Sequence, residues 1–231
     1  MLSTLIATLA LAPQAAALEP IPNHLTQQEK AEGFRLLFDG KTTDGWKGWR
    51  RQEMPKGWQV RDGSLVILPE LKAGGDIATK EQFADFELRL EWKVTPGGNS
   101  GIFYRASEEF RLPWATGPEM QVLDNERHPD GKSPLTSAGS NYGMHPAPID
   151  AAKPAGEWNA VRLVAKGKHI EHWLNGKKVV EYEVDSHDWL ERYKKSKFAG
   201  MPNYARNPSG HIVLQDHGNE VEFRSIKIKP L

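Results

Sequence analysis

A strictly alternating run over residues 86–94 constrains the fold of this chain more than any other feature. The run reads FELRLEWKV, with an apolar side chain at every even-numbered position and a charged one at every odd-numbered position. Because successive side chains of a β-strand point to opposite faces, the run predicts a strand with one buried and one solvated face. Strands of this kind are typical of antiparallel sheets, whose outer face can meet water.

Similar short runs recur at intervals of roughly 8–15 residues, without the alternating helices that a parallel sheet requires. Between them, Asp-Gly at 39–40 and 62–63 and Asn-Gly at 175–176 predict hairpin-type turns. The predicted fold class is therefore all-β, an antiparallel sandwich or jelly roll.

Two short helices and two long loops complete the expected fold. A capping box that begins at Thr26 predicts one helix, and Asp185 or Ser186 caps the other. The segments Ala106–Pro118 and Asn125–Glu157 lack a strand pattern. Long ordered loops in a compact domain are usually functional, so we expect these two segments to contribute to a site.

Composition excludes several classes of function. The 30 basic and 30 acidic residues cancel, so no overall field favours nucleic acid or an anionic membrane as a partner. The sequence has no cysteine, which excludes thiol catalysis, disulfide bonds and thiolate metal sites. Its 8 tryptophans and 21 glycines suit a β-sandwich with tight turns, and exposed tryptophans suit sugar stacking.

The first residues have the pattern of a secretory signal. An apolar run over Leu2–Ala12 precedes an A-x-A cleavage pattern at 15–17, although no Lys or Arg comes before the run. We therefore expect a signal peptide at 1–17, an extension at 18–32 and one domain at 33–231, in a secreted or periplasmic protein. The alternative is an N-terminal helix packed on the domain. No other apolar stretch approaches the length of a membrane span, so no span is expected.

The stretch PEMQVLDN places two polar side chains on one face of a predicted strand. Glu119 and Gln121 point to one side, and Met120 and Val122 point to the other. A solvated outer face would explain the polar pair. A binding cleft on the sheet explains it better, because a loop rich in Asp, Asn and His follows directly.

Several motifs occur in an order that resembles the 3-keto-disaccharide hydrolase family. They are LLFDGKTTDGW, DFELRLEW, GGNSGIFYR, PEMQVLDN, YG before HPAP, KPAGEWN, WLNGKKV and LQDHGNEVEFRSIKIKPL. The family is also described as 3-keto-glucoside 1,2-lyase and 3-keto-2-hydroxy-glucal hydratase. The resemblance covers about residues 33–231 and implies a concanavalin-like jelly roll with a concave carbohydrate face. One departure is His172, which stands where an aliphatic residue is expected, so the core there is rearranged or His172 is exposed.

The resemblance implies an enzyme that cleaves 3-keto-glycosides by elimination and hydration. A ketone at carbon 3 acidifies the hydrogen at carbon 2, so a base can abstract it, and the enolate then expels the aglycone from carbon 1. Water adds back afterwards. Such a site needs a base, a group that stabilises the enolate oxygen and an acid for the leaving oxygen.

Three residues are the candidates for catalysis. Glu119 is the first choice for the base or a ligand, because burial in a cleft would raise its basicity. Arg105 ends the strand SGIFYR and suits an enolate or a carboxylate partner such as Glu119; otherwise it forms a structural ion pair. His145, in the long loop, can exchange protons near neutrality unless it is simply exposed.

The candidates for binding a small carbohydrate substrate lie on the same predicted strands and loops; they are Asn99, Ser100, Gln121, Tyr142 and Gln215. A divalent metal stays an open alternative, since oxygen and imidazole ligands suit several metals. Its candidate ligands are Glu119, Asp124 and His145, with His128 and Asp130 nearby. Their spacing matches neither a helical metal motif nor a calcium loop.

Two other functions fit the same fold. A non-catalytic carbohydrate-binding module would use Trp114, Tyr142 and Trp158 as stacking platforms and would need neither Glu119 nor Arg105. A conventional glycosidase would need two carboxylates that flank the bond. The spacing Glu119-x-Gln121 disfavours the glycosidase, because an amide stands where a second acid is expected.

Overall fold

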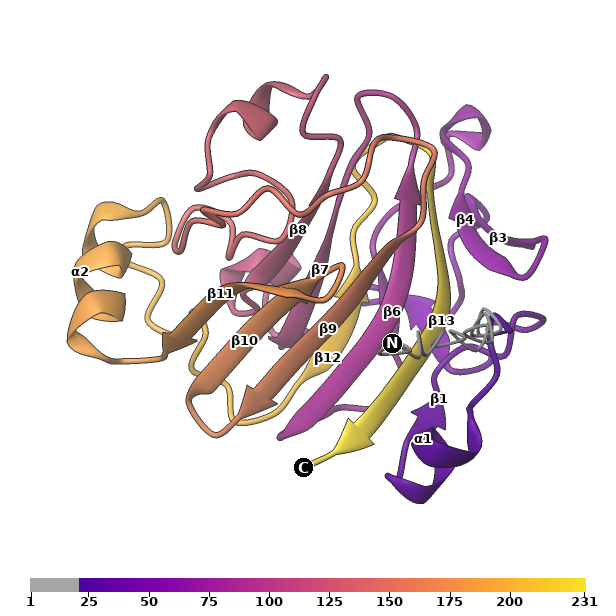
Figure 1. Cartoon of the computed structure of the whole chain (residues 1–231), viewed down its shortest axis with the longest axis horizontal. Coiled ribbons are helices and arrows are strands. Elements are labelled where there is room, and N and C mark those ends of the chain that lie inside the picture. The colour runs from indigo at the N-terminus through magenta and orange to yellow at the C-terminus, as the bar shows by residue number, and fades with distance from the viewer. Residues whose placement is uncertain (1–20) are drawn as a thin grey trace, which may run out of the picture.

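The computed structural model describes residues 21–231, so the expected signal peptide at 1–17 lies outside the described residues. Two antiparallel sheets pack face to face, as the alternating runs predict (Figure 1). The larger sheet contains β1 (Arg35–Leu36), β3 (Trp58–Arg61), β4 (Ser64–Ile67), β6 (Phe86–Val94), β9 (Asn159–Lys166), β10 (His169–Leu174), β11 (Lys177–Glu183) and β13 (Val221–Pro230). The smaller contains β2 (Trp46–Gly48), β5 (Ile77–Thr79), β7 (Asn99–Ala106), β8 (Glu119–Leu123) and β12 (His211–Leu214).

Both sheets combine neighbouring strands in the sequence with pairs that are distant in sequence. The order in the larger sheet is β11-β10-β9-β6-β13-β4-β3, with β1 also paired to β13. The order in the smaller sheet is β2-β5-β12-β7-β8. The expected jelly-roll sandwich is therefore confirmed, and the smaller sheet ends at β8, the strand that carries Glu119.

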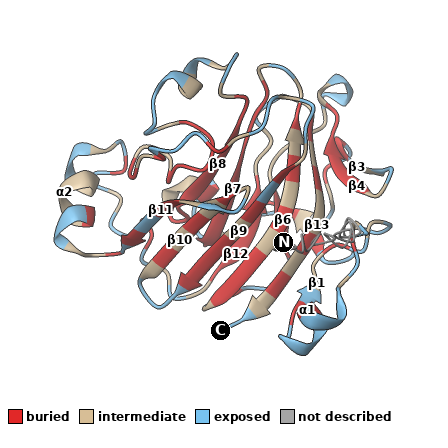
Figure 2. Cartoon of the chain, in the orientation of Figure 1, coloured by how far each residue is buried: buried red, intermediate tan, exposed pale blue. Residues whose placement is uncertain are grey.

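The strand predicted from strict alternation, β6, lies near the middle of the larger sheet between β9 and β13. Its apolar side chains at 86, 88, 90, 92 and 94 are each at most 2% exposed and form the centre of the core. Figure 2 shows buried and intermediate positions alternating along this strand. The core therefore lies between the sheets.

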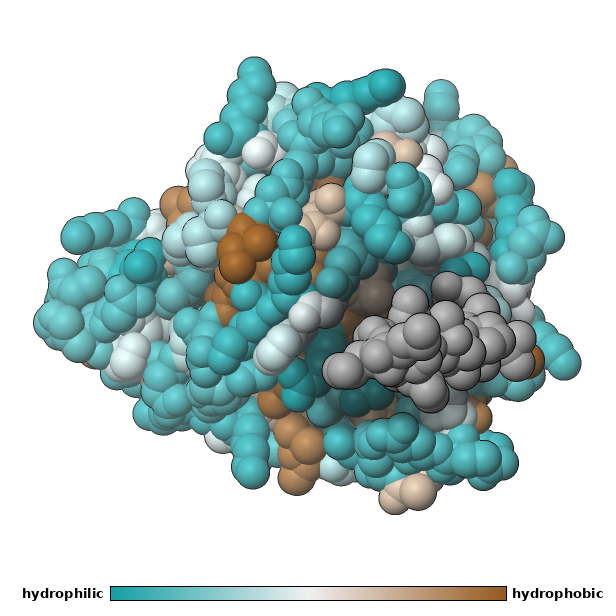
Figure 3. All heavy atoms as spheres, in the orientation of Figure 1, coloured by the Kyte–Doolittle hydropathy of each residue, from teal (hydrophilic) through white to brown (hydrophobic). Residues whose placement is uncertain are grey.

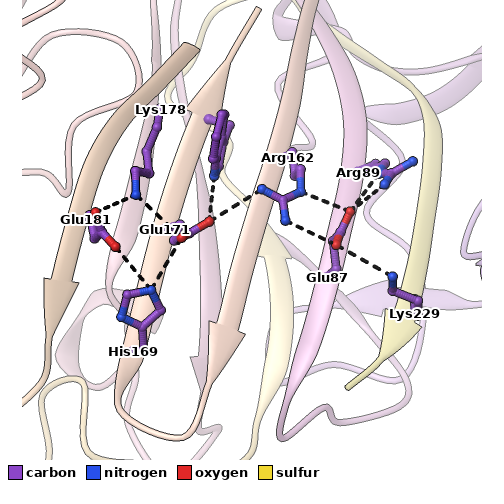
Figure 4. Close-up of polar contacts among 9 residues, drawn as sticks. Glu87, Arg89, Arg162, His169, Glu171, Lys178, Glu181 and Lys229 are labelled. Atoms are coloured by element: carbon purple, nitrogen blue, oxygen red, sulfur yellow. Dashed lines mark hydrogen bonds and ion pairs between the residues drawn. The ribbon is translucent and has the colours of Figure 1, made fainter. Parts of the chain in front are cut away.

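The charged side of the same strand belongs to a ladder of ion pairs on the outer face of the larger sheet (Figure 4). Glu87 pairs with Arg89 at 2.7 Å and with Arg162 at 3.1 Å, and Arg162 reaches Glu171 at 3.4 Å. Hydrophilic side chains cover most of the visible surface on this side (Figure 3). This face is solvated, as the alternation predicts.

Two of the three predicted hairpin turns are confirmed. The turns at 62–63 and 175–176 join β3 to β4 and β10 to β11, and all four of their residues have positive φ. Asp39 and Gly40 also form a turn, but they do not join paired strands, because β1 pairs with β13. There the Asp39 carboxylate accepts the backbone N–H groups of Lys41 and Thr42 instead.

The helices begin where their caps predict. In α1 (Gln27–Ala31) Thr26 and Glu29 form a complete capping box, and Ser186 caps α2 (His187–Lys195) by accepting from the Trp189 N–H. Three short 3₁₀ turns, Pro69–Leu71, Pro113–Ala115 and Pro129–Lys132, lie in loops. No helix in the described part of the chain is long and apolar enough to cross a membrane.

The long loop 125–157 adds an irregular edge to the smaller sheet, at the upper left of Figure 1. The Gln121 N–H donates to the Ser140 carbonyl at 3.1 Å, and the Tyr142 N–H donates to the Glu119 carbonyl at 3.0 Å. This segment therefore holds Tyr142 beside Glu119.

Candidate active site

The smaller sheet buries different residues on its two faces. Its inner face contributes Ile102, Met120, Val122, Ile212 and Leu214 to the main core. A second apolar cluster, formed by Trp49, Ala78, Phe103, Ala106 and Val213, covers part of the outer face. Glu119 pairs with Phe103 across β7 and β8 and so shares this outer face. The predicted opposition of Glu119 and Gln121 to Met120 and Val122 is present in the structure.

Glu119 is a buried carboxyl group without a hydrogen-bond partner among the described residues, and only 6% of the residue is exposed. Its side chain lies across Gly101 on β7, where a Cβ atom would approach the Glu119 Cδ to 2.9 Å. Burial raises the pKa of Glu119 to about 8; Lys197 opposes the rise, and the charges of Asp76 and Asp130 add to it. The group therefore holds its proton at neutral pH and becomes a strong base when it loses it.

Lys197 is the cation whose charge acts on the pKa of Glu119. Its Nζ lies 4.3 Å from the ring centroid of Tyr142, 5.2 Å from that of Phe198 and 5.8 Å from that of Trp114. The residue as a whole is exposed, but desolvation of the ammonium lowers its pKa, while Glu119 and Asp130 act in the opposite direction. No sequence motif marks this lysine, which follows α2 by two positions.

Tyr142 brings a hydroxyl group to the same place. Its hydroxyl donates to Oδ2 of Asp130 at 3.2 Å. Burial and the charge of Asp130 raise the pKa of Tyr142 to about 12. Asp130 is itself held by the long loop, where its N–H donates to Nδ1 of His128. The loop therefore presents a fixed hydroxyl and a carboxylate next to Glu119.

Two further carboxyl groups, those of Asp76 and Asp216, lie close together where β12 ends and β5 begins. The Asp216 N–H donates to Oδ1 of Asp76 at 2.9 Å, and the Asp216 carboxylate accepts from the N–H groups of Gly75 and Gly218. Burial raises the pKa of Asp76 to about 6, and the charge of Asp216 adds to the rise. Asp216 thus builds the turn with Gly218, and Asp76 is a buried carboxyl group with a raised pKa.

Two of the predicted substrate-binding residues present unused acceptors. Oδ1 of Asn99 and Oε1 of Gln215 are buried and have no hydrogen-bond partner in the described part of the chain. Both lie on the outer face, since Asn99 alternates with Gly101 along β7 and Gln215 donates its N–H to the Gly101 carbonyl. Buried polar atoms are nearly always paired, so these two suit a ligand or ordered water.

Gln121 and Ser100 are less available. The Gln121 amide donates to the Thr136 carbonyl at 3.3 Å and accepts from the Val122 N–H at 3.1 Å, so the long loop already occupies it. Ser100 points to the inner face, and its hydroxyl donates to the Gln215 carbonyl at 2.7 Å. The expected contact of Ser100 with substrate is therefore not supported by its position.

The expectation that Arg105 stands beside Glu119 is wrong. A bulge near the end of β7 shifts its register with β12, and Arg105 has a φ of 50°. The guanidinium donates to the carbonyls of Ala84 and Gly167 and pairs with Asp85 at 2.9 Å. The alternative, a structural ion pair, describes this arginine.

His145 also lies elsewhere, because it faces the interior of the sandwich. Its ring stacks on Tyr182 with centroids 4.3 Å apart, and Nδ1 lies 2.9 Å from Nδ2 of Asn141. Burial lowers the pKa of His145 to about 4, so the ring is neutral at ordinary pH. Tyr182 belongs to the main core, on the opposite side of β8 from Glu119.

His172 resolves the departure from the family pattern, since it is 0% exposed. Its Nε2 lies 2.9 Å from the Tyr104 hydroxyl, and its Nδ1 lies 3.0 Å from the Gly139 carbonyl. The core is thus rearranged around a hydrogen-bonded histidine. Trp158 is not a platform beside Glu119 either: it lies 4.0 Å from the Arg224 guanidinium, a residue of the larger sheet.

The suggested metal ligands do not converge. The Asp124 carboxylate accepts from the N–H groups of Gly97 and Glu126, and His145 lies inside the sandwich. Within residues 21–231, one group has metal-like spacing: His169, Glu171 and Glu181. It lies on the outer face of the larger sheet, where Lys178 pairs with both glutamates (Figure 4).

Comparison with known proteins identifies the family of this chain. Residues 33–229 match the 3-keto-alpha-glucoside-1,2-lyase-like domain family. A 3-keto-disaccharide hydrolase of Bacteroides thetaiotaomicron is 36% identical over 87% of this chain and 79% of its own. A crystal structure of a glycosyl hydrolase described as putative, from Parabacteroides distasonis, is 36% identical with a TM-score of 0.83, covering 91% of this chain and all of that one.

A Bacillus subtilis protein with a galectin-like fold, at 11% identity and a TM-score of 0.52 over 91% of this chain and 94% of that one, shares the fold alone. The match to the family spans nearly the whole described domain, and it includes every residue placed around Glu119. The chain therefore belongs to the 3-keto-alpha-glucoside-1,2-lyase-like domain family.

Proposed function

We propose that this chain cleaves the glycosidic bond of 3-keto-glycosides by elimination followed by hydration. The name of the Bacteroides relative supports the reaction, because that protein is a 3-keto-disaccharide hydrolase. The observation that carries the proposal is Glu119: a buried carboxyl group with no hydrogen-bond partner among the described residues, on an outer sheet face and beside a cation.

Glu119 serves as the base that removes the hydrogen from carbon 2. With a pKa of about 8, its carboxylate is far more basic than a solvated one, and general bases work best with a pKa near the operating pH. No hydrogen bond to another of the described residues has to break before this carboxylate can accept the proton. Elimination needs only this one base at carbon 2, which fits a strand where an amide occupies the second position.

Lys197 takes the role expected of Arg105. Its ammonium lies over the ring of Tyr142, and its charge acts on Glu119. A partly desolvated ammonium stabilises the enolate oxygen that forms as the carbon 2 hydrogen leaves. The same charge favours the ionised form of Glu119, so the base and the enolate share one counter-ion.

Tyr142 is the acid for the leaving oxygen. Its pKa of about 12 is close to that of a sugar hydroxyl, so the proton can pass in either direction with little cost. The hydrogen bond to Asp130 fixes its hydroxyl. Asn99 and Gln215 bind the hydroxyl groups of the sugar through their unused acceptors.

A conventional glycosidase is the second candidate, and one observation favours it. The charges of Asp76 and Asp130 both act on Glu119, so the site does contain more than one carboxyl group. Two carboxyl groups on either side of the bond would suit an acid and a nucleophile or base. Such an enzyme would cleave a disaccharide whether or not carbon 3 is oxidised.

The test compares a 3-keto-disaccharide with its unoxidised parent, for the wild type and for Glu119→Gln. We expect the wild type to cleave the keto substrate alone, and the variant to lose a factor on the order of a hundred to ten thousand in rate. In heavy water the released keto sugar should carry deuterium at carbon 2, because solvent replaces the abstracted proton.

The exposed Glu126 provides a matched control, and Glu126→Gln should keep full activity. Cleavage of the unoxidised parent at a similar rate would identify the glycosidase instead. Loss of activity in Glu119→Gln without deuterium at carbon 2 would keep the site and reject the elimination.

A further inference from the structure

A cavity of about 550 Å³ adjoins the candidate active site at Asp76. Its lining residues come from three segments, namely the end of β2, the stretch before β5 and the loop after β7; they are Trp49, Arg50, Arg51, Gly75, Asp76, Arg111 and Leu112. Three of these seven side chains are guanidinium groups. Asp76 connects the cavity to the candidate active site, since it lines the cavity and its charge raises the pKa of Glu119.

The three arginines have no partner in the described part of the chain. Neither an ion pair nor a hydrogen bond joins the guanidinium groups of Arg50, Arg51 and Arg111 to residues 21–231, and all three residues are exposed. Other arginines are ion-paired; they are Arg35, Arg89, Arg105, Arg162, Arg192, Arg206 and Arg224. Five arginines thus have no ion pair within residues 21–231, and three of them line this one cavity, while Arg61 and Arg127 do not, in a chain whose formal net charge is zero.

Nearby acids do not neutralise the cavity. Glu108 is held by Lys47 at 2.7 Å, and it also accepts the Arg50 N–H. Asp76 is the one carboxyl group among the lining residues, against three arginines. An adjoining cavity shares Arg51 and adds Lys56 and Lys72 against Glu53. The positive charge therefore continues beyond the cavity.

Hydrogen bonds hold the backbone of two of the segments that carry these arginines. The Trp49 indole N–H donates to the Arg111 carbonyl at 3.0 Å, which ties the β2 end to the loop after β7. Arg50 has a φ of 55°, and its N–H is bonded to the Glu108 carboxylate at 2.8 Å. Two segments far apart in sequence are thus joined so that their guanidinium groups line one space.

We propose that this cavity binds an anionic group, a carboxylate or a sulfate, on the aglycone of a glycoside whose keto sugar lies over Glu119. Guanidinium groups bind both oxyanions with paired hydrogen bonds. A neutral aglycone would leave three unpaired cations beside the substrate. The inference rests on the proposed function, and it names acidic glycosides as the substrate class of the same site.

The test measures binding first, because binding does not depend on turnover. Isothermal titration calorimetry compares an unoxidised glucosyl-glucuronic acid disaccharide with the matching glucosyl-glucose disaccharide, on the wild type and on Arg50→Gln/Arg111→Gln. We expect the acidic sugar to bind the wild type about tenfold more tightly, which is about 1.4 kcal/mol. The double variant should lose this preference, and added salt should weaken it.

Arg61→Gln is the matched control, since Arg61 is exposed on β3, away from the cavity, and should change nothing. A sulfate-bearing disaccharide forms a second arm, and whichever sugar binds more tightly identifies the anion. Equal binding of acidic and neutral sugars to the wild type would overturn the proposal. So would equal competition by inorganic sulfate at the same concentration, which would mean an unspecific anion site.

Turnover then separates the two hypotheses. With the 3-keto forms of the same disaccharides, we expect kcat/KM to follow the binding preference in the wild type and to lose it in the double variant. Preferential binding of the acidic sugar without cleavage of either keto sugar would reject the proposed reaction and keep the anion site. Cleavage of both keto sugars at equal kcat/KM, with equal binding, would reject the anion site and keep the reaction.

Discussion

At the scale of single residues, the raised pKa of Glu119 makes the folded state less stable as pH rises. Its pKa is about 8 in the folded chain and near the ordinary 4.5 when unfolded. Between these values the unfolded chain releases its proton and the folded chain keeps it, so this group destabilises the fold increasingly as pH rises to about 8. Above that pH both states are ionised and the penalty is complete.

Replacing Glu119 with Gln removes this penalty. We expect the variant to match the wild type near pH 4 and to become more stable relative to it up to about pH 8, by an amount on the order of a few kcal/mol. Urea denaturation of both proteins across this range measures the difference. A constant difference at all pH values would mean that Glu119 has an ordinary pKa and is solvated.

Some residues of the candidate site could be predicted from the sequence and others could not, because only some of them are positioned by local structure. Alternation alone places Glu119 and Gln121 opposite Met120 and Val122, because side-chain direction in a strand follows from period two. The position of Arg105 does not follow from alternation, since a bulge in β7 directs its side chain to Asp85. Lys197 and Asp76 carry no local signal: their proximity to Glu119 arises from pairing between segments distant in the chain.

At the scale of elements, the pairing of β7 with β8 determines where the Glu119 carboxyl group sits. Gly101 lies opposite Gln121, and the absent side chain there leaves the space that the Glu119 carboxyl group fills. In Gly101→Ala the new methyl would meet the end of a flexible side chain, so Glu119 can move while the sheet stays intact.

We therefore expect Gly101→Ala to melt within a few degrees of the wild type and to lose roughly a hundredfold in turnover of a 3-keto-disaccharide, as misplacement by about 1 Å can cause. The control is the double variant with Glu119→Gln, where the same alanine should cost nothing further. An additional loss of activity in that background would show that Gly101 acts on another group.

Elements with strong local signals were predicted well. The capping box at Thr26 and the cap at Ser186 both fix helix starts, because side-chain caps satisfy backbone N–H groups that the helix leaves free. The turn at 39–40 has the same dipeptide as a hairpin and yet joins no hairpin, since its strand pairs with β13. Turn chemistry determines a local bend, and tertiary pairing determines which strands it connects.

At the scale of the whole molecule, period-two alternation was enough to predict the fold class, but not the order of the strands. The sheet order brings β6 next to β13, and β7 next to β12, over more than a hundred residues of sequence. No local pattern encodes these neighbours. They follow from burying the apolar faces of the two sheets against one another.

That burial gives the last prediction. Leu88 is 0% exposed near the middle of β6, between β9 and β13, so Leu88→Asp would place an unpaired carboxylate in a dry core. A buried charge without a partner costs several kcal/mol, comparable to the whole stability of a domain, so we expect no cooperative thermal transition. Leu88→Met keeps the volume and should cost less than about 1.5 kcal/mol. Calorimetry of both variants checks this, and a cooperative transition in Leu88→Asp would show that this face of β6 meets water.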